Sequence, residues 1–479
     1  MSSGRRSERD LLGEREVPGQ VYWGIHTLRA IENFQISGTP ISAYPDLVNG
    51  LAAVKEAAAL TNRDLGLLDP KRADAIVRAC EEIRAGKLHD QFVVDVIQGG
   101  AGTSTNMNAN EVIANRGLEL MERERGDYAA LHPNEHVNMS QSTNDVAPTA
   151  LKVASWFAIH RLIEAMHVLR AAFEAKADEF KDILKIGRTQ LQDAVPMTLG
   201  QEFSAYSVML AEDIQRLRET TSLIREINMG ATAVGTGITA HPEYAARVRE
   251  HLARITDIPF ITAPNLVEAT QDAGAFVQLS GVLKRIAVKL SKVCNDLRLL
   301  SSGPRAGLAE INLPPAQAGS SIMPGKVNPA IPEAVNQVAF EVIGNDVTVS
   351  FAAEAGQLQL NAFLPILAHS IFKSVTHLSN GCVILAERCI RGITANRDRL
   401  EEYVARSIGI VTALNPYIGY ANATEIAQEA LRSGRSVRDL VLERKLLTKE
   451  QLSDILTPDK LTQPTEIPST KERATQQTA

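Results

Sequence analysis

The apolar residues between positions 276 and 300 recur at alternating spacings of three and four. This pattern is a heptad seam, which is typical of long helices that pack at shallow angles. With its flank from Thr270, the segment predicts one helix of roughly 45 Å at 1.5 Å per residue. The seam consists of Phe276, Leu279, Leu283, Ile286, Leu290, Val293, Leu297 and Leu300.

Four more segments predict long helices in the middle of the chain. The apolar residues of 159–180 and 210–227 keep the same spacing as the seam. Pro332 suits the first turn of a further helix, which Pro365 ends or kinks, and a fifth helix covers 371–390. Five long helices predict a helical bundle, and they favour an oligomer in which the bundles of several subunits pack together.

Shorter elements flank the predicted bundle. Before it we expect one short strand at 21–23 and helices at 51–65, 72–86 and 110–124. After it come short helices, and then a polar tail with several prolines that we expect to be disordered from about residue 461.

The sequence therefore predicts a mostly α-helical chain of three domains, in keeping with the ~150 residues of an average domain. They are an N-terminal mixed helical domain (1–142), a central bundle of five long helices (143–396) and a small C-terminal helical domain (397–479).

Composition excludes several classes of protein. The net charge is −6, the basic residues are spread along the chain, and only 5% of residues are aromatic, which argues against a nucleic-acid partner. The four cysteines form no CxxC pair, so we expect no disulfide framework. No signal peptide or membrane span is indicated either. A cytoplasmic protein is expected.

Four stretches interrupt the helical pattern and are rich in small hydrogen-bonding residues. Each alone is explained by helix caps and turns. Together they favour a site that surrounds an anion, because helix N-termini and backbone N–H groups bind carboxylates well. The stretches are QGGAGTSTNMN (98–108), SQSTND (140–145), GRTQLQDAVP (187–196) and GSSIMPGKVNP (319–329).

Familiar cofactor and metal motifs are absent or broken. The stretch 319–329 differs from a phosphate-binding P-loop, because its spacing is one residue too long and Val327 stands where a hydroxyl is needed. The GxGxxA match at 235–240 lacks a strand before it. His132 and His136 do not form HExxH, so no metal and no cofactor are expected.

The stretch 319–329 permits two interpretations from its residues alone. As a mobile loop it would close over an anion, with Lys326 supplying charge, Asn328 and backbone N–H groups supplying dipoles, and one serine acting chemically. As a plain surface turn it would carry a solvated lysine. Local chemistry leaves both interpretations open.

GSSIMPGKVNP resembles the signature loop of the fumarase/aspartase superfamily, and the resemblance extends from residue 11 to about residue 464. The stretches 98–108 and 140–145, together with AAEAGQLQLN (352–361), are more similar to the aspartate ammonia-lyase branch than to the fumarases. The resemblance implies a homotetramer with a core of twenty long helices, whose active sites each combine loops of three subunits. The implied reaction is reversible anti elimination of ammonia from L-aspartate, which gives fumarate through an aci-carboxylate intermediate.

The resemblance also implies roles for individual residues. Ser320 is the implied general base, and Asn144 helps to hold the amino group. Gln190 stands where fumarases and some aspartases have histidine; it donates a hydrogen bond but relays no proton at neutral pH. Carboxylate or loop contacts are implied for Thr103, Ser142, Thr143, Thr189, Gln190, Ser321, Lys326 and Asn328.

Two other functions remain open at this point. A fumarase would hold the same four-carbon dicarboxylate, and Gly99-Gly100, Thr143 and Gln190 argue against it. A non-catalytic helical protein is the second alternative, against which the intact set of polar loop residues argues.

Overall fold

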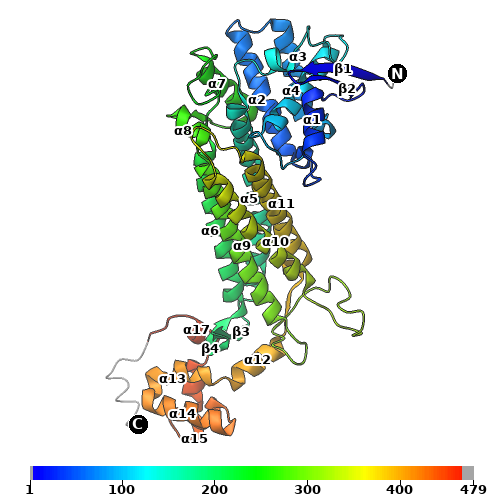
Figure 1. The fold of residues 1–479 in the computed structure, drawn as a ribbon. Coiled ribbons are helices and arrows are strands. Elements are labelled where there is room, and N and C mark those ends of the chain that lie inside the picture. Colours follow the sequence, from blue (N-terminus) through cyan, green and yellow to red (C-terminus); the bar gives the residue numbers. More distant parts are fainter. Residues whose placement is uncertain (1–3, 467–479) are drawn as a thin grey trace. The chain divides into compact units, whose positions relative to one another are not determined.

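The structure is a computed structural model that describes residues 4–466, and most of these residues are helical (Figure 1). The helices are α1 Ile25–Asn33, α2 Pro45–Asp64, α3 Pro70–Arg84, α4 Thr103–Leu120, α5 Thr143–Glu179, α6 Leu199–Ile224, α7 Tyr244–Thr256, α8 Leu266–Gln271, α9 Gly274–Leu300, α10 Ala330–Glu354, α11 Leu364–Arg388, α12 Arg397–Arg406, α13 Val411–Ile418, α14 Tyr420–Ser433, α15 Val437–Glu443, α16 Lys449–Ile455 and α17 Pro458–Thr462.

The strands of the described residues form four two-stranded sheets. The pairs β1–β2, β3–β4 and β7–β8 are antiparallel, and β5–β6 is parallel. The strands are β1 Arg5–Asp10, β2 Gly13–Pro18, β3 Leu184–Thr189, β4 Gln192–Thr198, β5 Glu226–Ile227, β6 Ile261–Thr262, β7 Ile311–Asn312 and β8 Thr394–Ala395.

The predicted helical fold is confirmed, including its five long helices. They are α5, α6, α9, α10 and α11, and every residue of the seam on α9 is buried. The prediction for Pro365 is wrong, because α10 already ends at Glu354. Pro365 is instead the second residue of α11. The N–H groups in the first turn of a helix make no bond within the helix, so proline is tolerated there.

The described residues divide into two compact units. The first contains residues up to 164 together with 213–288 and 338–380, and the second contains 165–212, 289–337 and the residues from 381 onward. Each of the five long helices contributes one stretch to each unit. The three predicted domains stay a prediction.

Helix α2 forms the centre of the first unit and is buried over most of its length. It packs against α3 and α7. Gly50 of α2 lies directly against α5, since a Cβ added there would be 2.5 Å from the carbonyl oxygen of Ala150. The long helices are joined by polar contacts: Asp346 of α10 accepts hydrogen bonds from Ser280 (2.8 Å) and Lys284 (2.6 Å) of α9.

In the second unit the long helices pack through an aromatic cluster of Phe173, Phe180, Phe203 and Tyr206. The C-terminal helices α13 to α16 have an apolar core of their own, which includes Leu414, Ile426 and Leu452. The tail expected to be disordered from about residue 461 lies mostly outside the described residues; its first two residues belong to α17.

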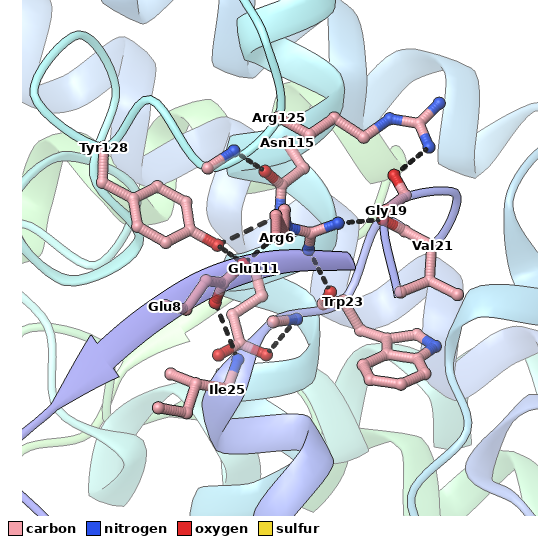
Figure 2. Close-up of polar contacts among 12 residues, drawn as sticks. Arg6, Glu8, Gly19, Val21, Trp23, Ile25, Glu111, Asn115, Arg125 and Tyr128 are labelled. Carbon is pink, nitrogen blue, oxygen red and sulfur yellow. Dashed lines mark hydrogen bonds and ion pairs between the residues drawn. The ribbon is translucent and has the colours of Figure 1, made fainter. Parts of the chain in front are cut away.

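The short strand predicted at 21–23 is absent, and two hairpins occur where no strand was expected. At residues 21–23 the guanidinium of Arg6 on β1 donates to the carbonyl oxygens of Val21 (2.9 Å) and Trp23 (2.6 Å) (Figure 2). These carbonyls are therefore held by a side chain. The predicted helix 110–124 begins earlier, at Thr103, and takes in the second half of the glycine-rich stretch.

Two buried carboxylates hold the start of α1, which has no N-cap side chain of its own (Figure 2). Glu111 of α4 accepts backbone N–H bonds from Gly24 (2.8 Å), His26 (2.8 Å) and Thr27 (3.1 Å). Glu8 of β1 accepts the remaining N–H of this turn, from Ile25 (2.8 Å). The two carboxylates thus accept hydrogen bonds from the four N–H groups that the start of a helix leaves without a partner. Burial raises the pKa of Glu111 to about 7.

We expect Glu111→Leu to lower the free energy of unfolding by about 3 kcal/mol or more, because it leaves several buried N–H groups without an acceptor. Glu111→Gln keeps one acceptor oxygen and loses less. Urea titration followed by circular dichroism measures both, with exposed Glu124→Leu as the control. Equal losses in Glu111→Leu and Glu124→Leu would show that α1 does not depend on this carboxylate.

Candidate active site

The glycine-rich stretch 98–108 contains a tight turn that leads into α4. Gly100, Ala101 and Gly102 all have positive φ, and a Cβ on Gly102 would be 3.3 Å from the Cβ of Ala147 on α5. This close approach brings the N-terminus of α4 beside that of α5. Thr103 opens α4 with an exposed side chain, whose hydroxyl donates to the carbonyl oxygen of Gly100 (2.7 Å).

The stretch 140–145 forms the N-terminus of α5 as a reciprocal cap. The hydroxyl oxygen of Ser142 accepts from the N–H of Asn144 (3.2 Å), and Asp145 accepts from the N–H of Ser142 (3.0 Å). The hydroxyl oxygen of Thr143 accepts from the side-chain amide of Asn106 on α4 (3.0 Å). Because that bond uses only an acceptor site, the Thr143 hydroxyl keeps its proton for a ligand.

The structure therefore brings four predicted site residues together in the first unit: Thr103, Ser142, Thr143 and Asn144. They lie at the N-termini of two adjacent helices, where the positive ends of both helix dipoles favour an anion. The side chains of Ser142, Thr143 and Asn144 are partly exposed.

A fully buried lysine lies beneath these helix ends. Lys55 of α2 donates to the side-chain oxygens of Asn138 (2.8 Å) and Gln141 (2.9 Å), in the segment that leads into α5. Asn138 also accepts from Asn106 (3.1 Å), the residue that bonds to Thr143. Burial lowers the pKa of Lys55 to about 7 and raises that of the nearby Asp145 to about 6.

The sequence analysis missed Lys55, Asn106 and Asp145 as supports of the site. Lys55 had a visible signal, because it is a single cation inside the apolar run LAAVKEAAAL. Asn106 and Asp145 lie inside two of the predicted loop stretches. The bonds of Asn106 to Asn138 and Thr143, and of Asp145 to Gly230 and Thr232, join residues distant in sequence, so no spacing reveals them.

In the second unit, Thr189 and Gln190 lie at the tip of the β3–β4 hairpin. Thr189 pairs with Gln192 at the end of the ladder, and Gln190 and Leu191 form the two-residue turn with φ of 54° and 63°. Both predicted site residues are exposed. The base of the hairpin is held by buried ion pairs, in which Glu310 contacts Lys185 (2.9 Å) and Arg188.

The stretch 319–329 is a loop closed at its base. Gly319 donates its N–H to the carbonyl oxygen of Lys326 (2.8 Å) and accepts from the side-chain amide of Asn328 (2.7 Å). A Cβ on Gly319 would lie 2.5 Å from that Lys326 oxygen, so glycine is required here. The side chains of Ser321 and Lys326 are exposed.

Ser320 occupies a distinctive position in this loop. Its hydroxyl oxygen accepts backbone N–H bonds from Ile322 (3.2 Å) and Met323 (2.9 Å). Two N–H donors on one hydroxyl oxygen favour its ionised form. Within residues 4–466 no hydrogen bond joins this loop to the tip of the β3–β4 hairpin.

No group of three or more His, Cys, Asp or Glu side chains that could hold a metal occurs among the described residues. In the same part of the chain, none of the helices is long and apolar enough to cross a membrane.

Comparison with known proteins identifies the family. A family model described as lyase matches residues 13–344, and one described as fumarase C C-terminus matches residues 410–463. An aspartate ammonia-lyase from Helicobacter pylori strain J99 is 57% identical over 459 residues, with 96% of this chain and 98% of that protein covered. One from Escherichia coli K12 is 56% identical, with 97% of each covered. The chain belongs to the aspartate ammonia-lyase family.

Solved structures agree with membership of the aspartate ammonia-lyase family and its superfamily. The chain is 55% identical to a Brucella melitensis protein described as fumarate lyase:delta crystallin bound to cobalt, with a TM-score of 0.94 and coverage of 96% of this chain and 100% of that one. A class II fumarase from Schistosoma mansoni is 36% identical, with a TM-score of 0.90 and coverage of 95% and 98%. The resemblance inferred from the four loops is confirmed.

We expect the buried lysine to make stability depend on pH. Between pH 7 and about pH 10 the unfolded chain keeps a proton on Lys55 that the folded chain has released, so the free energy of unfolding rises with pH, by at most about 1.4 kcal/mol per unit. Lys55→Met removes this contribution. Urea titrations at pH 7, 8 and 9 measure the difference from wild type, with exposed Lys71→Met as the control. A difference that stays constant over this range would contradict the lowered pKa.

Proposed function

We propose that the chain catalyses the reversible anti elimination of ammonia from L-aspartate to give fumarate. The observation that carries the proposal is the pair of adjacent helix N-termini, α4 and α5, which present hydroxyl groups and two positive dipole ends to one anion. Relatives named aspartate ammonia-lyase, 56% and 57% identical over nearly the whole chain, support the same reaction.

The substrate carries two carboxylates and an ammonium group, and we assign separate residues to each. Thr103, Ser142 and Thr143 of the first unit hold carboxylate oxygens, and Asn144 holds the ammonium group. We assign the other carboxylate contacts to Thr189, Gln190, Lys326 and Asn328, and a loop contact to Ser321; in the proposed tetramer, loops of more than one subunit supply them.

Ser320 is the proposed general base. Its alkoxide removes a proton from the carbon next to the β-carboxylate, and the electron pair moves into that carboxylate to form the doubly charged aci-carboxylate. The Cα–N bond then breaks, ammonia leaves, and the double bond of fumarate forms. The N–H groups of Ile322 and Met323 reduce the cost of the alkoxide, and Lys326 stabilises the charge that develops on the substrate.

The active enzyme is proposed to be a homotetramer of three-domain subunits, with twenty long helices in its core and loops of three subunits in each site. Support comes from the first-unit part of α10, which exposes Phe340 (61%), Val347 (51%) and Phe351 (71%) at spacings of seven and four. Free cysteines suit a reducing compartment, and we place the enzyme in the cytoplasm.

We expect Ser320→Ala to lower kcat by about 10²–10⁴-fold, the usual contribution of a general base. Ultraviolet absorbance of the fumarate double bond measures the rate with L-aspartate, and L-malate in a parallel cuvette tests for a fumarase. Ser321→Ala should lose less, because it removes a contact and leaves the base. Near-normal turnover of Ser320→Ala would exclude this serine as the base, and a rise with L-malate alone would contradict the ammonia-lyase.

We expect the double variant Phe340→Lys, Phe351→Lys to form smaller species and to lose activity, because each site needs several subunits. Light scattering gives the mass of the species, and the fumarate assay gives its activity. Leu431→Lys changes an equally exposed apolar residue on α14 and serves as the control. A fully active monomer would refute the shared active site.

A further inference from the structure

A turn distant in sequence holds Asn144 at both its main chain and its side chain. The carbonyl oxygen of Ala233 accepts from the side-chain amide of Asn144 (2.7 Å). The side-chain amide of Asn228 donates to the carbonyl oxygen of Asn144 (3.1 Å). The turn 228–233 therefore restrains the residue that we assign to the ammonium group.

The turn depends on one buried carboxylate, that of Asp145. Its Oδ2 accepts the N–H groups of Gly230 (3.1 Å) and Thr232 (2.9 Å), while its Oδ1 accepts the N–H of Ser142 (3.0 Å). Gly230 and Thr232 have φ of 95° and 56°, in the left-handed region that is unfavourable for threonine. Asp145 is fully buried, so no water replaces it as the acceptor.

The contact with Ala233 decides which end of the Asn144 side chain is presented to the substrate. A carbonyl oxygen only accepts hydrogen bonds, so the NH₂ group of Asn144 must face Ala233. Oδ1 is then the end left for a ligand. An ammonium group only donates hydrogen bonds, so it needs an acceptor such as Oδ1. A flipped amide would instead turn the NH₂ group of Asn144 toward the ammonium group, and both groups are donors.

We propose that Asp145 is a positioning residue for ammonium recognition, which acts by fixing the turn 228–233 so that the Oδ1 of Asn144 faces the substrate nitrogen. The inference rests on the proposed function, since it assigns a further residue to the same site. If Asp145 served only to cap α5, its substitution would weaken the binding of the substrate carboxylates and of the ammonium group together.

The test uses the reverse reaction, in which fumarate and ammonium are separate substrates. Asp145→Asn keeps the shape of the side chain but replaces one acceptor oxygen by an NH₂ group. We expect the KM for ammonium to rise about tenfold or more, as for loss of a hydrogen bond to a charged group. The single amide oxygen of the Asp145→Asn side chain serves either the turn 228–233 or the N–H of Ser142, so the KM for fumarate and the inhibition constant of succinate, which has no nitrogen, should rise less than the KM for ammonium. In Asn228→Ala, which leaves the acceptor of Ser142 in place, both constants should stay within about twofold of wild type.

The matched control is Asp69→Asn. Asp69 also caps a helix through its carboxylate, accepting the N–H groups of Lys71 (3.0 Å) and Arg72 (3.2 Å) at the start of α3. It makes no contact with the turn 228–233, so both KM values should equal those of wild type.

A second variant decides the question if Asp145→Asn fails to fold by circular dichroism. Asn228→Ala removes one of the two contacts to Asn144 and should raise the KM for ammonium alone, by a smaller factor. The inference is overturned if the folded variant leaves the KM for ammonium unchanged, or raises both KM values equally. A wild-type enzyme that does not interconvert L-aspartate and fumarate instead overturns the proposed function, and the inference with it.

Discussion

The cluster of polar residues at the N-termini of α4 and α5 depends on one physical requirement, that buried polar groups must be paired. The N-termini of α4 and α5 lie side by side, over a core that contains the buried Lys55 and Asp145. Lys55, Asn138 and Asn106 form a chain of hydrogen bonds that ends at the hydroxyl of Thr143. The partly exposed hydroxyl of Thr143 is thus oriented by buried partners.

The same device appears at the start of α1, where Glu8 and Glu111 supply acceptors that the helix lacks. In both places a carboxylate on one segment satisfies the backbone of another. Such contacts hold the segments in place because one buried carboxylate accepts several N–H groups at once. The second unit supports its hairpin similarly, through Glu310 with Lys185 and Arg188.

The sequence predicts the long helices well and the supports of the site poorly, and the reason is physical. The seam on α9 is a local, repeated pattern, so its buried face follows from spacing alone. The loops also carry local signals, since Ser142 and Asp145 are spaced as a helix cap. The bonds from Asp145 to Gly230 and Thr232 join residues distant in sequence, and the β3–β4 hairpin turns at Gln190-Leu191, which lacks the usual Asn-Gly signal. Val21 and Trp23 show the limit most clearly, because the side chain of Arg6 holds carbonyls that their own composition would assign to a strand.

The tip of the β3–β4 hairpin has a consequence for heat resistance. Its two-residue turn places Gln190 and Leu191 in the left-handed region, where neither is favoured and where Asn-Gly is the usual choice. Each such residue costs about 1–3 kcal/mol. A consensus or thermostability screen will therefore favour replacing this dipeptide, yet glycine or asparagine in place of Gln190 removes the longer amide. At this turn, the substrate contact proposed for Gln190 opposes the replacement that backbone strain favours.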